Sequence, residues 1–177
     1  MGTPTTCSAS ITASMRAQYG FSADPTASNN TGGASSKALA FKLGTSDEPG
    51  KGTICWSAAK IAAANTPDNI DLSGALTNPD GAIVSFAKVR AILIEITSKD
   101  AADTGQQLTI GNGATPFLGP FGAAAHTVKI GLNDLFLITN WEDGWDVTNA
   151  TADILKLTPG SVATPYQIMM IGDGVTA

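Results

Sequence analysis

The sequence has little of the chemistry from which catalytic and metal sites are usually built. It contains one histidine and two cysteines, and only 14% of its residues are charged. A nucleophilic enzyme needs a base beside its serine or cysteine, and His126 stands in "AAAHTVKI" without a partner motif. Zinc sites built from histidines are excluded by the count. We therefore expect no enzyme, no catalytic residue, no metal and no cofactor, with His126 an ordinary residue at the start of a strand.

Runs of one charge and long apolar segments are also missing. The net charge is −5 and the ten basic residues are scattered, so the electrostatic footprint of a nucleic-acid-binding protein is absent. No segment approaches the ~20 apolar residues of a membrane span, and the N-terminus lacks the pattern of a secretory leader. We expect neither a nucleic-acid nor a membrane partner. Cys7 and Cys55 are too far apart to indicate a disulfide framework, and two unpaired thiols are expected.

What the sequence does contain is a series of short alternating segments. With 177 residues it is expected to form a single domain, residues 1–177. Apolar residues recur at every second position, and clusters of Gly, Pro, Asn and Asp separate these runs at intervals of roughly 8 to 12 residues. This predicts an all-β, single-domain β-sandwich, with jelly-roll or Greek-key connectivity favoured. The predicted strands are 11–21, 38–43, 53–64, 69–76, 86–97, 106–110, 126–132, 134–140, 144–148, 152–157 and 165–172.

Three segments depart from simple alternation. The run "AKIAAA" at 59–64 has a helical alternative, because alanine is the best helix former. The polar run at about 22–37, "SADPTASNNTGGASSK", is predicted to be a flexible, mobile loop. The glycine-rich "IGNGATPFLGPFG" at 110–122 is interrupted by prolines, which argues against a phosphate-binding loop. It is predicted to be a rigid connection that packs Phe117, Leu118 and Phe121 into the sandwich or a neighbour.

The segment "NWEDGWDVTNATAD", residues 140–153, is the main candidate site. A strand is predicted on each side of Glu142, Asp143 and Gly144, which suggests a three-residue hairpin loop with Gly144 at positive φ. Trp141 and Trp145 would then face each other across the hairpin. We interpret the exposed acidic turn as a possible contact site for a basic neighbouring subunit. The contact residues are Trp141, Glu142, Asp143, Gly144 and Trp145.

Two chemical alternatives for this segment are less favoured. Calcium binding needs converging oxygens, and the acidic residues lack the D-x-D-x-D spacing of a self-contained loop, although Asp153 has the option of returning beside the turn. A glycosidase needs paired carboxylates, yet 6% aromatic residues are few for a glycan cleft. The candidate carboxylates are Glu95, Asp134, Glu142, Asp143, Asp146 and Asp153.

Four short runs stand out along the chain: D-L-x-G-x-L-T in "DLSGALT", F-x-K-V-x-A-I in "FAKVRAI", G-W-x-V-T in "GWDVT" and D-I-L-K in "DILK". Over roughly residues 54–172, these motifs resemble those of small virion proteins of tailed phages. The chain is similar to the capsid cement or decoration proteins among them, which implies a jelly-roll core and a non-enzymatic role. The resemblance further implies a homo-oligomer, a dimer or trimer, on the outer surface of the virion capsid, where it bridges subunits of the major capsid protein.

The acidic turn is not explained by this resemblance. Glu142, Asp143 and Gly144 make a turn that is more acidic than the family pattern, so no role is carried over to them. The alternative function is a receptor- or glycan-binding module of a phage spike or fibre, suggested by the tryptophans and carboxylates of 140–153. A fibre protein normally carries a repetitive shaft or a coiled coil for trimerisation, and the sequence has neither.

Overall fold

The computed structural model describes residues 8–17, 33–43, 51–52 and 54–174, apart from 75, 78–80, 82 and 98–103. Every regular element in these ranges is a β-strand, so the expected all-β class is confirmed and the helical alternative for 59–64 is wrong. The described part accordingly contains no helix that is long and apolar enough to cross a membrane.

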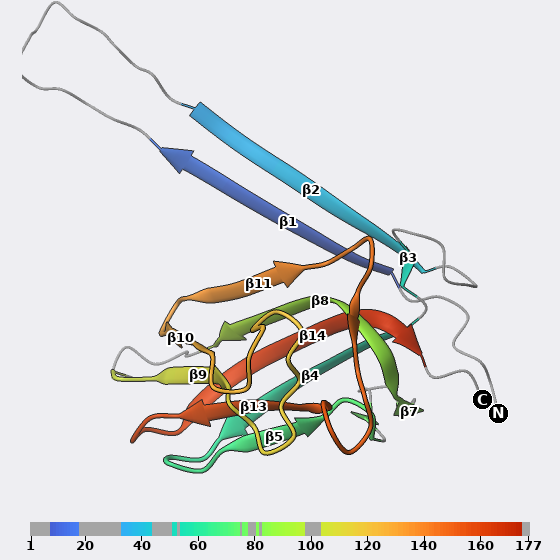
Figure 1. Cartoon of the computed structure of the whole chain (residues 1–177). Coiled ribbons are helices and arrows are strands. Elements are labelled where there is room, and N and C mark those ends of the chain that lie inside the picture. The colour runs from blue at the N-terminus through green and yellow to red at the C-terminus, as the bar shows by residue number, and fades with distance from the viewer. Residues whose placement is uncertain are drawn as a thin grey trace, which may run out of the picture.

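Two large sheets form the body of the protein (Figure 1). Sheet one has the order β11-β8-β14-β4, with β12 also paired to β8. Its strands are β4 (Ile54–Ala62), β8 (Phe86–Ile96), β11 (Leu135–Thr139), β12 (Trp145–Asp146) and β14 (Thr164–Gly174). Sheet two has the order β10-β9-β13-β5. Its strands are β5 (Asp68–Asp71), β9 (Gln107–Gly111), β10 (Thr127–Gly131) and β13 (Ile154–Pro159).

Alternation along the strands explains why the two sheets pack together. On β8, Ile92, Ile94 and Ile96 are buried because successive side chains point to opposite faces and these three share the inner one. Sheet two contributes its own inner residues to the same apolar cluster. The sheet two residues include Leu108, Ile110, Ile130, Leu155 and Leu157. Sheet one also contributes Trp56, Tyr166, Ile168 and Met170 to this cluster. One core shared by two sheets makes the protein a β-sandwich, as predicted.

A polar contact also joins the sheets at one end of the core. The hydroxyl of Tyr166 on β14 donates a hydrogen bond to the carboxylate of Asp68 on β5, and Lys60 Nζ on β4 lies 3.0 Å from the same carboxylate. Burial, and then the bond to Asp68, raise the pKa of Tyr166, so the phenol stays neutral and keeps its donor. The Tyr166 hydroxyl is thereby satisfied although its ring is fully buried.

The glycine-rich connection between β9 and β10 behaves largely as expected. Phe117 is 1% exposed and Phe121 9% exposed, so both pack into the core, and the Phe121 ring stacks on Phe136 with centroids 6.4 Å apart. Leu118 is 40% exposed, so it does not pack into the sandwich, and its packing against a neighbour stays a prediction. A short pair of strands, β6 (Leu76–Thr77) and β7 (Ile83–Val84), lies before β8.

A separate two-stranded ribbon precedes the sandwich. It consists of β1 (Ser8–Ala17) and β2 (Gly33–Leu43), and β2 also pairs in parallel with β3 (Lys51–Gly52). The prediction of a flexible loop at 22–37 is wrong for residues 33–37, because pairing with β1 gives their backbone a ladder whatever their side chains are. Residues 18–21 of the predicted first strand, and 22–32 of the predicted loop, lie outside the described residues.

Cys55 on β4 is disulfide-bonded, so the expectation of two unpaired thiols is wrong. Cys7, the other cysteine in the sequence, lies outside the described residues. The spacing of cysteines excludes only a dense disulfide framework, and it does not show which distant segments the fold brings beside β4.

Two isoleucines of sheet one test the assignment of its inner and outer faces. Ile94 is fully buried, and Ile94→Ala should lower the free energy of unfolding by about 2 to 5 kcal/mol, because it leaves a cavity. Ile61 is 72% exposed, and Ile61→Ala should change it by about 0.5 kcal/mol or less. Urea denaturation of both variants measures the difference, and equal losses would contradict the assignment.

Candidate functional site

The predicted contact residues lie in a loop at the edge of sheet one. The acidic loop, residues 140–144, connects β11 to β12. Both strands pair antiparallel with β8, through Thr139 with Ala91 and through Trp145 with Val89. The chain therefore continues in one direction along β8, and the prediction of a hairpin is wrong. Residues 140–144 are instead an outward loop opposite the single residue Arg90.

Hydrogen bonds within the acidic loop close it on itself. The backbone N–H of Gly144 donates to the carbonyl of Asn140 at 3.0 Å, and the Asn140 side-chain amide donates to the Gly144 carbonyl at 2.9 Å. The N–H of Asn140 also donates to the Arg90 carbonyl on β8. Gly144 has φ +69°, which confirms the positive φ predicted there and explains the glycine.

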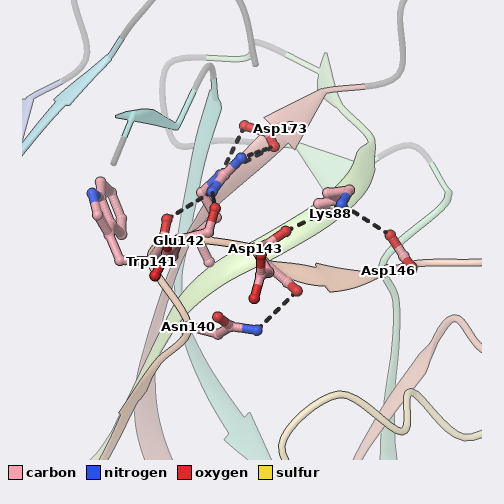
Figure 2. Close-up of polar contacts among 9 residues, drawn as sticks. Lys88, Asn140, Trp141, Glu142, Asp143, Asp146 and Asp173 are labelled. Carbon is pink, nitrogen blue, oxygen red and sulfur yellow. Dashed lines mark hydrogen bonds and ion pairs between the residues drawn. The ribbon is translucent and has the colours of Figure 1, made fainter. Parts of the chain in front are cut away.

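A buried arginine supports the acidic loop from below. Arg90 is 3% exposed, and its Nε and Nη2 donate to the carboxylate of Asp173 at distances of 2.9 to 3.2 Å. Its Nη1 donates to the carbonyls of Trp141 at 2.7 Å and Glu142 at 2.8 Å. In Figure 2, Asp173 lies on the side away from Trp141 and Glu142. A buried charge needs such partners, because an unpaired one is strongly unfavourable.

A second cation contacts the far side of the acidic loop. Lys88 Nζ donates to the Asp143 carbonyl at 3.1 Å and lies 3.4 Å from the Asp146 carboxylate (Figure 2). Both side chains of this ion pair are largely exposed, so water and salt screen it and its contribution to stability is small. Arg90 is thus the principal support of the loop, and Lys88 is a secondary one.

The two tryptophans do not face each other. Trp141 packs with Ala91 and Ile171 in a small cluster, whereas Trp145 packs with the main core. The prediction of a facing aromatic pair is wrong for the same reason as the hairpin: Trp141 and Trp145 follow one another along one edge instead of sitting on paired strands. They therefore do not form a shared stacking platform for a sugar.

The carboxylates of Glu142 and Asp143 remain the exposed part of the acidic loop, as predicted. Asp146 is exposed as well, but it is paired with Lys88. Among the described residues, no group of three or more His, Cys, Asp or Glu side chains is arranged to hold a metal ion. The loop offers two carboxylates on a fixed backbone, which suits contact with a basic surface.

Asp153 belongs to a different polar group. It is 3% exposed, and it accepts hydrogen bonds from the Ala150 N–H, Thr115 Oγ1 and Ser73 Oγ at 2.6, 2.9 and 3.0 Å. Burial by itself raises the pKa of Asp153, but the hydrogen bonds from Ala150, Thr115 and Ser73 together lower it below its ordinary value. These partners join the 149–153 corner to neighbouring segments, so the role of Asp153 here is structural.

The other sequence candidates lie apart from the acidic loop. His126 directly precedes β10, as predicted, and its Nδ1 lies 2.7 Å from the Phe121 carbonyl. Arg90 and Asp173 were not predicted to take part in the site. A signal for them exists, since each is a charged residue within an apolar run, "FAKVRAILI" and "IMMIGDG", and buried charges are almost always paired.

Substitution of Arg90 tests its role as the principal support. Arg90→Met leaves the buried Asp173 carboxylate uncompensated and should lower the free energy of unfolding by about 3 to 5 kcal/mol. Lys88→Met breaks an exposed pair and should lower it by about 1 kcal/mol or less. The double variant Arg90→Met/Asp173→Leu should recover part of the first loss. Urea denaturation gives all three values, and equal losses for Arg90→Met and Lys88→Met would refute the assignment.

The pKa of Asp153 gives a pH-dependent prediction. Because the folded-state pKa is lowered, the ionised carboxylate stabilises the fold above the unfolded-state pKa of about 3.9. That stabilisation is lost as the pH falls through the lower, folded-state pKa. Between about pH 5 and pH 3, the free energy of unfolding should therefore fall more steeply for the wild type than for Asp153→Asn. Parallel curves for the two proteins would contradict this.

The chain matches no family model, and a search of curated proteins finds no similar one. The resemblance to tailed-phage cement and decoration proteins therefore stays a prediction, carried by the motifs between residues 54 and 172.

Proposed function

We propose that this protein is a structural virion protein that binds the outside of an icosahedral phage capsid and cements neighbouring subunits of the major capsid protein. The identity of the partner comes from the motifs of residues 54–172. The structural observation that carries the proposal is the acidic loop, in which exposed Glu142 and Asp143 stand on a backbone that Arg90 holds. The role is non-enzymatic: a cement protein stabilises whichever assembled state it binds, by mass action.

A preformed loop is an advantage for such a contact. Binding is weakened by the entropy lost when loops and side chains become ordered. The acidic loop is already closed by the bonds between Asn140 and Gly144, and Arg90 binds two of its carbonyls. Its carboxylates therefore meet a basic surface without first ordering their own backbone. Charge complementarity of this kind speeds encounter and sets orientation more than it sets raw affinity.

The connectivity of the sandwich is the finer part of the fold proposal. Four successive pairs of main strands cross from one sheet to the other, namely β4 and β5, β8 and β9, β10 and β11, and β13 and β14, whereas β9 and β10 are neighbours in sheet two. In the orders β11-β8-β14-β4 and β10-β9-β13-β5, the two strands of each such pair stand at the same position in their sheets. We infer a jelly roll, in which eight strands form two sheets through two Greek keys.

The glycan-binding alternative receives less support from the tryptophans. Trp56 is 3% exposed and packs in the core, and Trp141 and Trp145 belong to separate apolar clusters. A stacking site needs rings with free faces that converge on one sugar. We therefore keep the capsid-binding role as the proposed function.

Capsids assembled without this protein provide the test. Purified protein should co-sediment with them and raise the temperature at which they release their contents. The double variant Glu142→Gln/Asp143→Asn should bind about tenfold more weakly at low salt, because it loses both exposed charges. The matched control Ala124→Lys/Ala125→Lys makes the same change of net charge on another exposed loop and should bind as the wild type does.

Two outcomes would contradict the proposal. A wild-type protein that neither binds these capsids nor changes their heat resistance rules out the cement role. Equal weakening by the two double variants would leave the cement role standing but remove the acidic loop from it, since net charge alone would then explain the effect.

A further inference from the structure

Two lysines of the sandwich have no partner. Among the described residues between 54 and 174, the other lysine and arginine side chains are those of Lys60, Lys88 and Arg90, and each pairs with a carboxylate. Lys129 on β10 and Lys156 on β13 make no side-chain hydrogen bond or ion pair within this part of the chain. Both positive charges are therefore available to another molecule.

The two lysines lie on the outer face of sheet two, the face that points away from the core. Lys156 follows the buried Leu155 on β13, and Lys129 precedes the buried Ile130 on β10, so both side chains alternate outward. Asp71 is the one acidic residue of this face, and its carboxylate caps the turn after β5. The outer face of sheet two is thus positive on balance, in a chain of net charge −5.

A hollow lies beside Lys156 on this outer face. It has a volume of about 240 Å³ and is lined by Pro67, Asn69, Ala114, Ile154 and Lys156. Lys156 and Asn69 are directly paired residues of β13 and β5, so their side chains stand next to each other. The Asn69 amide, like the Lys156 ammonium, makes no hydrogen bond within the described part of the chain. The hollow therefore combines two unused donors with apolar walls from Pro67, Ala114 and Ile154.

The chemistry of the hollow selects a carboxylate as its occupant. Lys156 is already half-buried, and a surface that covers it removes the rest of its water. A buried ammonium without an anion is strongly unfavourable, so the covering surface has to supply one. A carboxylate accepts hydrogen bonds from an ammonium and an amide together, and charge-assisted bonds are the stronger ones. The methylene groups of an acidic side chain meanwhile suit the apolar walls.

The hollow and the acidic loop are on opposite sides of the sandwich. The loop follows β11, which is at one edge of sheet one, whereas β4 is at the other edge. Lys60 of β4 contacts Asp68 of β5, so β5 lies at the side away from β11. Figure 1 shows the same arrangement, with β11 above and β5 and β13 below. A protein that bridges two neighbours needs two separate contact surfaces, and these two differ in sign.

We propose that the hollow at Lys156 receives an acidic side chain of a second capsid subunit, beside the subunit that the acidic loop contacts. The carboxylate of that side chain accepts from Lys156 Nζ and Asn69 Nδ2. Glu142 and Asp143 of another copy are engaged by the loop contact, so the acid comes from the capsid. This inference deepens the bridging role of the proposed function and rests on it. Bridging then uses a basic surface on one subunit and an acidic side chain on the next.

Substitutions in the full-length protein test the hollow, with capsids assembled without this protein as the probe. Lys156→Met removes the charge and keeps an apolar stem, so it should weaken co-sedimentation about tenfold at low salt. Ala114→Phe fills the hollow without changing the charge and should weaken binding to a similar degree. Lys129→Met makes the same change of charge on the same face, outside the hollow, and should bind within about twofold of the wild type. Unchanged urea midpoints establish that the variants are folded.

A cross-link identifies the occupant. Carbodiimide treatment of capsids carrying the wild-type protein should join Lys156 to an Asp or Glu of the capsid protein, and mass spectrometry of the peptides locates the bond. A Lys156 cross-link to another copy of this chain instead would overturn the proposal, and so would equal binding by Lys156→Met and Lys129→Met.

The two proposals fail in different ways. If the wild type does not bind capsids, the cement role and the hollow contact are both wrong. If the wild type binds but Lys156→Met binds equally well, only the hollow contact is wrong. Combining Lys156→Met with Glu142→Gln/Asp143→Asn should multiply the two losses of affinity, because separate contacts contribute independently. A combined loss no larger than that of the loop variant alone also contradicts a second contact.

Discussion

The buried guanidinium of Arg90 shapes the edge of sheet one. A charged group on a central strand must find acceptors, and regular ladders on both sides would already have used those of the backbone. Arg90 has no paired residue in the ladder on either side of β8. Its neighbours do: Ala91 pairs with Thr139 and Ile171, and Val89 pairs with Trp145 and Gly172. On the β14 side this shift admits Asp173, and on the other side it admits the carbonyls of the acidic loop.

The glycines near Arg90 follow from the same shift. A Cβ on Gly172 would lie 1.9 Å from the Lys88 carbonyl oxygen, so the close approach of β14 to β8 requires glycine there. On the loop side, Gly144 takes a positive φ where the chain returns to β8. One arginine thus accounts for a bulge, a loop and two glycines, and the loop's acidic residues are exposed because its carbonyls point inward to Arg90.

The sequence predicted the parts of this fold that depend on local pattern. The alternation of "FAKVRAILIEIT" correctly indicated a central strand, and Gly144 was correctly expected at positive φ. The errors concern partners far apart in the chain. The "WEDGW" segment predicts a hairpin, because a turn between two strands usually reverses the chain. Only the pairing of both β11 and β12 with β8 shows that the chain does not reverse here. The bonded state of Cys55, and the link between Arg90 and Asp173, are likewise set by pairing that no local pattern encodes.

The acidic loop lies at one end of the face of sheet one that points away from the core, and the two surfaces differ in chemical character. Trp141 packs on Ala91 and Ile171 at one end of that face, while the next two residues in the chain, Glu142 and Asp143, are exposed. Exposed charges act over distance but are screened by salt, so they guide orientation and encounter rate. Apolar burial is insensitive to that screening and scales with area. Arg90 holds the two in one fixed arrangement, because it binds the carbonyl of Trp141, which packs on the apolar side, and that of Glu142, whose side chain is exposed.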